Sequence, residues 1–375
     1  MFYKQFPQEN PSSLKYAVVI PRNDDSAPVG IALSIANAAH KHGFDVCVYW
    51  FTNVNNGQIR HDGVTRNYLE LSKYNIIHSH LLRPDLFCFF LRIIFTLRRL
   101  CARAKPIFVS TVHSDFKYEL SLDRNYFIAL FASYAWLYAT KHLDAVIFTS
   151  KTVQKTYFPN YDNSFVIHNG VDFEQINRSD KFIDDDIVAK INAFKQSDEI
   201  LVGYIGGLRA IKGVNHLICA LPKLPANYKL VILGAGSELS KLNELISDLN
   251  LTDRVLFLGR VDSPYFYAKL FELTLFPSLS EAFCLAAVEA SYVAGNVIVS
   301  NIPTFIELLP DQIFPKFFSH DPECIGACIS EHLNAIREKS GAQKNYVFSR
   351  YSSELMGDRY CNLFNSLHHG SVFYE

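Results

Sequence analysis

The stretch LTLFPSLSEAFCLAAVEAS, residues 273–291, has the pattern of a buried strand that leads through a loop into a helix. LTLF is a short apolar run, and Pro277 ends it because proline has no N–H for the strand ladder. A helix is expected to begin near Phe283 or Cys284. Strands that alternate with helices in this way predict an α/β fold built on a parallel sheet.

The same alternation runs through the chain in two sets, separated by a polar, acidic segment at 172–199. The first set contains a helical pattern at 30–43 and apolar runs at 16–20, 45–50, 75–80, 107–112, 144–149 and 164–168. The second set has apolar runs at 200–205, 228–233, 254–259, 273–276 and 296–300. We therefore expect two Rossmann-like domains in tandem, whose ligands bind beyond the carboxyl ends of the strands.

Length and composition agree with this organisation. The 375 residues suggest two domains, and 49% hydrophobic residues with 19% charged residues permit a large core. The net charge of −1 gives no bias toward nucleic acid. The eight cysteines are scattered without a C-x-x-C motif, which predicts a reducing compartment with neither a disulfide framework nor a zinc site. With no signal-like or membrane-spanning apolar run, the expected location is cytoplasmic.

Two carboxylates stand in the otherwise small and apolar segment after LTLF. Glu281 falls in the expected loop, and Glu289 about one and a half turns inside the expected helix. The free N–H groups of Leu285 and Ala286 would point back toward the loop, where an anion can bind. We hypothesise that a phosphate binds there and that the carboxylates hold hydroxyl groups at the two ends of a nucleotide diphosphate sugar, because buried carboxylates need partners.

A second candidate is GYIGGLRAIKG, residues 203–213, which lies between an expected strand and an expected helix. Gly206 and Gly207 would let backbone amides approach an anion, and Arg209 and Lys212 supply positive charge. The segment is not a Walker loop, since G-x4-G-K-[ST] is absent. Taken alone, it fits a diphosphate site and a tight turn with solvated bases equally well.

The ordered set of motifs resembles the retaining glycosyltransferases of family 4 with the GT-B fold, of the bacterial surface-glycan type. The spacing of Glu281 and Glu289, E-x7-E after a Pro-Ser turn, is similar to that family's signature. The resemblance covers nearly the whole chain, through 76–80, 110–116, 144–150, 166–172, 203–213, 233–238, 255–261, 275–290, 295–307 and 351–367.

The resemblance implies a fold and an activity. The fold would place two Rossmann-like domains across a cleft: an acceptor-side domain at 1–175 and a nucleotide-sugar domain at 176–349, with the C-terminal helix of 350–375 crossing back to the first. The enzyme would transfer a sugar, from UDP-sugar before other donors, to a hydroxyl of a glycan or lipid-linked acceptor with retention of configuration. The setting would be lipopolysaccharide, capsule or O-antigen assembly, with no metal and no cofactor.

The resemblance also implies residue roles. Glu289 would bind the ribose and Glu281 the donor sugar. Arg209 or Lys212, with the amides of Leu285 and Ala286 and the Gly206-Gly207 turn, would hold the diphosphate. His113 would lie near the reaction centre, and the turn Gly259-Arg260-Val261 would meet the base.

Three departures from the family pattern affect these roles. Gly207 stands where many relatives have arginine, so Arg209 would substitute. Ala282 and Cys284 replace glycines, and Cys284 would narrow the sugar pocket. A single glycine, Gly30, remains in the loop on the acceptor side.

Other candidates have plainer interpretations. Asp184-Asp185-Asp186 is expected to be a solvated helix start. His78 and His80 alternate along a strand, so they should face the same side in a structural or pocket-lining role. The basic, apolar segment 86–105 would lie either on an anionic membrane or on the first-domain sheet. A non-catalytic GT-B subunit, a nucleotide-sugar epimerase and a sugar phosphorylase remain alternatives to the transferase.

Overall fold

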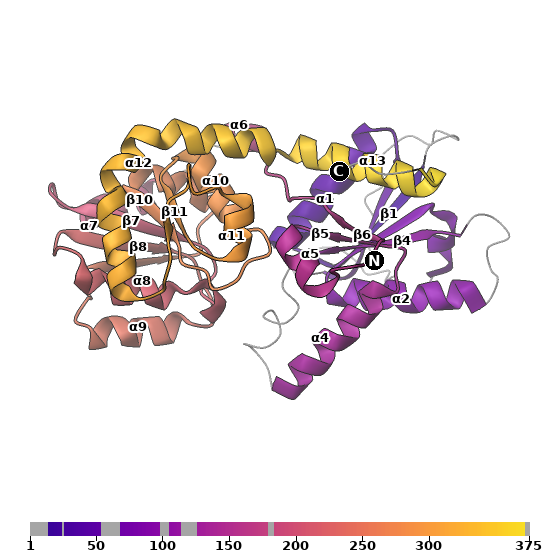
Figure 1. The fold of residues 1–375 in the computed structure, drawn as a ribbon, viewed down its shortest axis with the longest axis horizontal. Helices are drawn as coiled ribbons and strands as arrows, with labels where there is room; N and C mark the ends of the chain where they lie inside the picture. The colour runs from indigo at the N-terminus through magenta and orange to yellow at the C-terminus, as the bar shows by residue number, and fades with distance from the viewer. Residues whose placement is uncertain are drawn as a thin grey trace. The chain divides into compact units, whose positions relative to one another are not determined.

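The computed structural model describes residues 14–24, 26–53, 68–97, 105–113, 126–178 and 184–371. The chain divides into two compact units (Figure 1). Unit 1 comprises residues 1–170 together with 353–375, and unit 2 comprises residues 171–352. No helix of the described ranges is both long enough and apolar enough to cross a membrane.

Unit 1 contains a parallel sheet with the strand order β2-β1-β3-β4-β5-β6. Its strands are β1 (Lys15–Asn23), β2 (Asp45–Asn53), β3 (Ile76–His80), β4 (Ile107–Val112), β5 (Ala145–Phe148) and β6 (Ser164–Val166). Its helices are α1 (Ala27–Lys41), η2 (Tyr68–Lys73), α2 (Leu82–Leu97), α4 (Tyr126–Lys141), α5 (Lys151–Tyr157) and α13 (Ser353–His369). β3 and β5 are buried along their whole length. This explains the unbroken apolar run of β5, whereas β3 also buries three polar residues, His78, Ser79 and His80.

The C-terminal helix α13 belongs to unit 1, as predicted, although it follows all of unit 2 in the sequence. It packs closely on α1, since a Cβ on Gly357 would lie 2.4 Å from the Cβ of Ala38. The rings of Tyr16 and Phe364 lie 4.9 Å apart and join α13 to β1. Unit 1 is therefore completed by the end of the chain.

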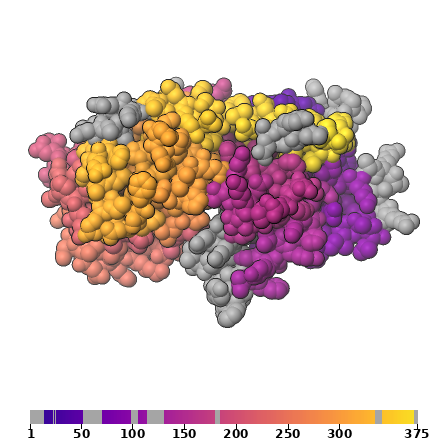
Figure 2. Space-filling model, viewed as in Figure 1, coloured from indigo at the N-terminus to yellow at the C-terminus, as the bar shows by residue number. Residues whose placement is uncertain are grey.

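Unit 2 contains a second parallel sheet, with the strand order β12-β11-β10-β7-β8-β9. Its strands are β7 (Ile200–Ile205), β8 (Tyr228–Leu233), β9 (Val255–Gly259), β10 (Leu273–Phe276), β11 (Val297–Ser300) and β12 (Lys316–Phe317). Its helices are α6 (Phe173–Arg178), α7 (Asp185–Phe194), η4 (Ala210–Lys212), α8 (Val214–Ala220), η5 (Leu221–Lys223), α9 (Leu239–Asp248), η6 (Pro264–Leu270), α10 (Leu285–Val293), α11 (Pro303–Leu308) and α12 (Pro322–Arg350). Figure 2 shows that the orange segments after β10 form much of this face of unit 2.

The strand order of unit 2 reverses between β7 and β10, which are neighbours in the sheet. The crevice at the carboxyl ends of strands at such a reversal is the usual ligand site of an open α/β sheet. The loops that follow these two strands contain the predicted diphosphate turn and the predicted Glu281. The backbone N–H of Leu279 donates to the carbonyl oxygen of Ile211 at 2.8 Å, so the two loops are in contact.

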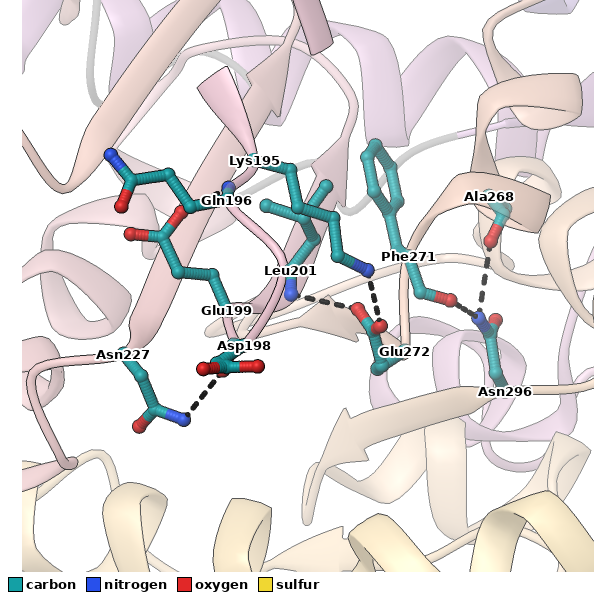
Figure 3. A network of polar contacts seen from close by, with 10 residues as sticks. All are labelled: Lys195, Gln196, Asp198, Glu199, Leu201, Asn227, Ala268, Phe271, Glu272 and Asn296. Carbon is teal, nitrogen blue, oxygen red and sulfur yellow. Dashed lines mark hydrogen bonds and ion pairs between the residues drawn. The ribbon is translucent and has the colours of Figure 1, made fainter. Parts of the chain in front are cut away.

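The opposite, amino edge of this sheet carries a polar network (Figure 3). Glu272, directly before β10, accepts from Lys195 Nζ and from the backbone N–H of Leu201, each at 2.7 Å. Asn296, directly before β11, donates to the carbonyl oxygens of Ala268 and Phe271. These bonds satisfy the polar groups that the entering strands bring into the protein.

Helix starts follow local sequence rules with one difference from the prediction. α10 begins at Leu285, as expected, and Asp184 caps α7 by accepting from the backbone N–H of Asp186 at 2.9 Å. α1 begins at Ala27, earlier than predicted, because Pro28 fits the first turn of a helix. Gly30 therefore lies inside the first turn of α1, where its N–H donates to the Ser26 carbonyl oxygen, and not in a loop.

Candidate active site

Three loops at the carboxyl edge of the unit 2 sheet are connected by hydrogen bonds between their backbones. The N–H of Gly206 donates to the carbonyl oxygen of Leu233 at 3.0 Å, and the N–H of Leu208 donates to that of Ala235 at 2.9 Å. The N–H of Gly234 donates to the carbonyl oxygen of Gly259 at 2.8 Å. A Cβ on Gly234 would lie 1.8 Å from the Gly206 oxygen, so only glycine permits this approach. The Gly206-Gly207 turn is therefore held in place from the neighbouring loop, with Gly207 exposed.

Glycine is also required where the first of these loops meets the loop after β10. Gly213 has φ +66°, and a Cβ there would lie 2.2 Å from the carbonyl oxygen of Pro277. This close approach brings Lys212 beside the Pro-Ser turn.

An ion pair joins the two predicted motifs. Lys212 Nζ lies 2.6 Å from Glu281 Oε1, and the Ser278 hydroxyl donates to the same oxygen at 2.7 Å. The Thr304 hydroxyl donates to the Glu281 carbonyl oxygen at 2.7 Å, which fixes the backbone of the loop. The side chains of Lys212 and Glu281 are 20% and 8% exposed. Each charge has therefore lost most of its contact with water and is stabilised by the opposite charge of the other.

The electrostatic environment keeps this lysine charged. Burial alone would lower the pKa of Lys212, but the charge of Glu281, the neighbouring Cys284 and the hydrogen bond to Glu281 together outweigh it, and the pKa is raised. The guanidinium of Arg209 is close enough to act on the pKa of Lys212 and of Tyr204. Tyr204 is buried beneath the loop and donates its hydroxyl to the Gly207 carbonyl oxygen at 2.9 Å. Two cations, one carboxylate and an exposed glycine turn thus share one small region.

Cys284 precedes α10 in a conformation that glycine would adopt more easily. Its backbone has φ 74° and ψ 74°, the left-handed region. Its side chain makes no capping hydrogen bond to α10, whose first N–H groups include those of Leu285 and Ala286. Burial, and then the Glu281 carboxylate, raise the pKa of the Cys284 thiol. A partly buried neutral thiol therefore lies beside an open helix start.

Glu289 differs from Glu281 in having no protein partner among the described residues. It lies in the second turn of α10 and is half-buried, and burial raises its pKa to about 7. The ring of Tyr265, in η6, is near enough for the carboxylate to affect the pKa of its hydroxyl. An unpartnered carboxylate in such a place is poised to accept hydrogen bonds from a ligand.

The predicted base-binding turn lies at the end of β9, which is separated from β7 by β8 in the sheet. Gly259 has φ +70° and Arg260 is exposed, while Val261 is half-buried. The backbone bond from Gly234 to Gly259 connects this turn to the glycine turn after β7 through the intervening loop.

Unit 1 brings a second set of predicted residues together, at the carboxyl ends of β3 and β4. Nδ1 of His80 lies 2.8 Å from Nε2 of His113, and their rings are stacked with centroids 5.1 Å apart. His78 and His80 face the same side of β3, as predicted, with ring centroids 4.1 Å apart. His78 Nδ1 lies 2.7 Å from the Tyr16 hydroxyl, and its Nε2 lies 2.7 Å from the Thr111 hydroxyl, which confirms a structural role.

Several residues of the site were missed by the sequence analysis. Tyr204, Ser278, Thr304 and Tyr265 support the predicted residues, but a single hydroxyl on a strand or helix gives no distinctive pattern. Ser278 had the best signal, since it directly follows the Pro277 that ends β10.

Some predictions lie partly outside the described residues. In the segment 86–105, residues 98–104, which include Arg98, Arg99 and Arg103, lie outside the described residues. In the motif that contains His113, residues 114–116 also lie outside them. Within the described ranges, no three His, Cys, Asp or Glu side chains are grouped as metal ligands would be.

Family models match both units. The model of glycosyltransferase family 4 matches residues 16–175, and the model of the group 1 glycosyl transferases matches residues 184–322. The O-antigen biosynthesis glycosyltransferase WclY of Escherichia coli is 27% identical over 376 residues, covering 94% of this chain and 99% of that protein.

Solved structures match over nearly the whole chain. Sucrose-phosphate synthase from Thermosynechococcus elongatus has a TM-score of 0.72 at 18% identity, covering 96% of this chain and 100% of that one. HepE of Anabaena in complex with UDP-glucose has a TM-score of 0.68 at 17% identity, covering 94% and 100%. The two parallel sheets, the two family models and these likenesses agree, and the chain belongs to the family 4 glycosyltransferases with the GT-B fold.

Proposed function

We propose that this glycosyltransferase moves a sugar from a nucleotide diphosphate sugar to a hydroxyl of a glycan or lipid-linked acceptor in O-antigen assembly, with retention of configuration. One observation carries the proposal. Around the start of α10, where the Cys284 side chain makes no capping bond, the Lys212–Glu281 pair and the Glu289 carboxylate offer contacts for an anion and for hydroxyl groups. Glu289 has no partner among the described residues. The O-antigen setting rests on the likeness to WclY over nearly the full length of both proteins.

Each part of the donor would have its own contact. The diphosphate lies against the Gly206-Gly207 turn and the N–H groups of Leu285 and Ala286, where the helix dipole favours an anion. Arg209 and Lys212 supply positive charge as the leaving diphosphate develops negative charge. We propose that these groups act without a metal ion, and the corresponding test is activity that EDTA leaves unchanged.

The two carboxylates would then have different tasks. Glu289 accepts from the ribose hydroxyls, because it is the carboxylate without a partner among the described residues. Glu281 binds the donor sugar with one oxygen while Lys212 and Ser278 hold the other. The turn Gly259-Arg260-Val261 meets the base. UDP is the first nucleotide to test, because HepE has been solved with UDP-glucose.

His113 would lie beside the transferred sugar without acting as a base. Burial lowers the pKa of His113 to about 3, so its imidazole is neutral at physiological pH and is a weak proton acceptor. Under retention by front-side attack, the departing phosphate takes the acceptor proton, and His113 contributes a hydrogen bond.

The acceptor is proposed to lie at an anionic membrane, which unit 1 would contact through α2 and α4. Exposed apolar side chains recur at helical spacing on both helices: Phe90, Ile93 and Leu97 on α2, and Phe131, Tyr134 and Tyr138 on α4. The rings of Phe89 and Tyr138 lie 5.8 Å apart and connect the two faces. Lys105 and Lys141 are exposed, and the sequence adds Arg98, Arg99 and Arg103 directly after α2.

Two experiments test these proposals. The purified protein is incubated with UDP-sugars, each with a lipid-linked oligosaccharide acceptor, and the anomeric configuration of the product is read by NMR. Transfer with retention supports the proposal, and transfer with inversion contradicts it. Flotation with vesicles containing anionic lipid tests the membrane contact, with Leu97→Glu/Phe131→Glu as the variant. Binding that is absent, or equal in the variant, would exclude this face.

A further inference from the structure

The pair formed by His80 and His113 has a property that the proposed function does not use. Nδ1 of His80 and Nε2 of His113 point at each other. The second nitrogen of each ring, Nε2 of His80 and Nδ1 of His113, takes no part in this contact. Both remaining nitrogens are buried and have no hydrogen-bond partner among the described residues. Such orphan atoms are rare in folded proteins, so their protonation is of functional interest.

The contact restricts the tautomers of the two rings. A neutral imidazole has one N–H and one lone pair, and the bond between the rings needs one of each. If His113 donates, His80 keeps an unpaired N–H and His113 an unpaired lone pair. If His80 donates, His80 keeps the lone pair and His113 presents an unpaired N–H at Nδ1. Burial lowers the pKa of both rings, so both are neutral and only these two arrangements remain.

The surroundings decide between the two arrangements. His80 is fully buried, with the ring of His78 against it, whereas His113 is half-buried at the end of β4. A buried N–H without an acceptor is less often tolerated than a buried lone pair without a donor. The unpaired N–H therefore belongs on His113, the ring nearer the open edge of the sheet.

We propose that His80 is a positioning residue that donates its Nδ1–H to His113 Nε2, and thereby fixes His113 as the Nδ1–H tautomer, a hydrogen-bond donor to an oxygen of the bound sugar. The last clause rests on the proposed function, while the tautomer does not. His78 takes no part, because its two ring nitrogens are occupied by Tyr16 and Thr111.

The tautomer can be measured directly in the ligand-free protein. Ring-15N-labelled histidine and long-range 1H–15N correlation spectra distinguish the Nδ1–H from the Nε2–H form, and the signals lost in His113→Asn identify the His113 ring. The expected result is the Nδ1–H form of His113. An Nε2–H form in the wild-type protein overturns the proposal without any need for a folded His80 variant.

Variants test the part that His80 plays. His80→Asn keeps an amide donor near the Nδ1 position and should preserve the tautomer, whereas His80→Leu should release it to a mixture. His78→Leu is the matched control, because it also removes a buried histidine from β3 but should leave the His113 tautomer unchanged. A pure Nδ1–H form in folded His80→Leu would show that His80 does not set it.

Turnover then separates this proposal from the proposed function. His80→Leu should lower kcat roughly 10- to 100-fold, with a smaller change in the donor KM, and His80→Asn should recover most of it. UDP affinity should not change in either variant. Unchanged kcat with a released tautomer would refute the hydrogen bond to the sugar. A wild-type protein without transfer activity would refute the proposed function and leave the tautomer result standing.

Discussion

The two edges of the unit 2 sheet differ in whether their polar groups have hydrogen-bond partners. At the amino edge, the Glu272 carboxylate has Lys195 and a backbone N–H, and Asn296 satisfies two carbonyl oxygens (Figure 3). At the carboxyl edge, Glu289 lacks a partner among the described residues, and Cys284 holds a left-handed backbone. Unsatisfied and strained groups gather where a ligand can compensate them, so we assign stability to the amino edge and propose ligand binding for the carboxyl edge.

The largest effect on stability is expected at the amino edge. Glu272→Ala leaves the Leu201 N–H unsatisfied and Lys195 unpaired, and should lower the free energy of unfolding by about 2–4 kcal/mol. Denaturant unfolding measures this loss. UDP affinity of the folded variant should equal that of the wild-type protein. A variant of full stability, or one with weakened UDP binding, would break the division between the edges.

Glu281→Gln should give the largest effect on turnover. The amide still hydrogen-bonds, but it removes the charge opposite Lys212 at the proposed sugar contact, so kcat should fall about 100-fold. UDP affinity should change only a few-fold, because other residues make the proposed nucleotide contacts. Steady-state kinetics and calorimetry on the same preparation separate the two quantities. An equal loss in both would assign Glu281 to nucleotide binding.

Glu289→Gln should make the protein more stable above pH 7. Burial raises the pKa of Glu289 from 4.5 to about 7, so the folded state binds more protons between these values and the wild-type protein loses stability as the pH rises through them. The variant has no carboxylate to ionise, so its free energy of unfolding at pH 8 should exceed that of the wild-type protein by up to roughly 3 kcal/mol. Thermal melts at pH 4 and pH 8 should show the gain only at pH 8; a gain of the same size at both would contradict the account.

The smallest effect is expected from Cys284→Gly. Glycine adopts the left-handed region without the clash of a Cβ, so the free energy of unfolding should rise by up to about 1 kcal/mol. Cys284→Ala is the control, because it removes the thiol and keeps the strain. Chemical denaturation of both variants isolates the backbone contribution. Stabilisation by alanine as well would place the effect in the side chain.

The sequence predicted the sheet better than it predicted the contacts around it. Strands buried on both faces read as apolar runs, and these correspond to β1–β11. β12 was missed because two residues carry no periodicity, and the long α12 because its apolar residues show little helical periodicity. The boundary of α1 was misplaced because Gly30 was read as a loop residue, although Pro28 fits a helix start.

Within the site, long-range contacts separate what was predictable from what was not. The Lys212–Glu281 pair joins residues 69 positions apart, and only the strand order brings them together. The register of β3 against β4, in which His80 is opposite Thr111, puts His113 on the same face as His80. That contact could have been inferred from strand pairing, whereas the left-handed backbone of Cys284 was indicated only by the glycine that the family pattern has at this position.

The most direct test of the central claim is the affinity of UDP for the wild-type protein and for Glu289→Gln, measured by calorimetry at pH 8 with EDTA present. Loss of a charged acceptor for the ribose hydroxyls should weaken binding at least tenfold, while thermal melts show that the variant is the more stable protein. Equal affinity of the two proteins would contradict the claim that the carboxyl edge of the unit 2 sheet binds the nucleotide through Glu289.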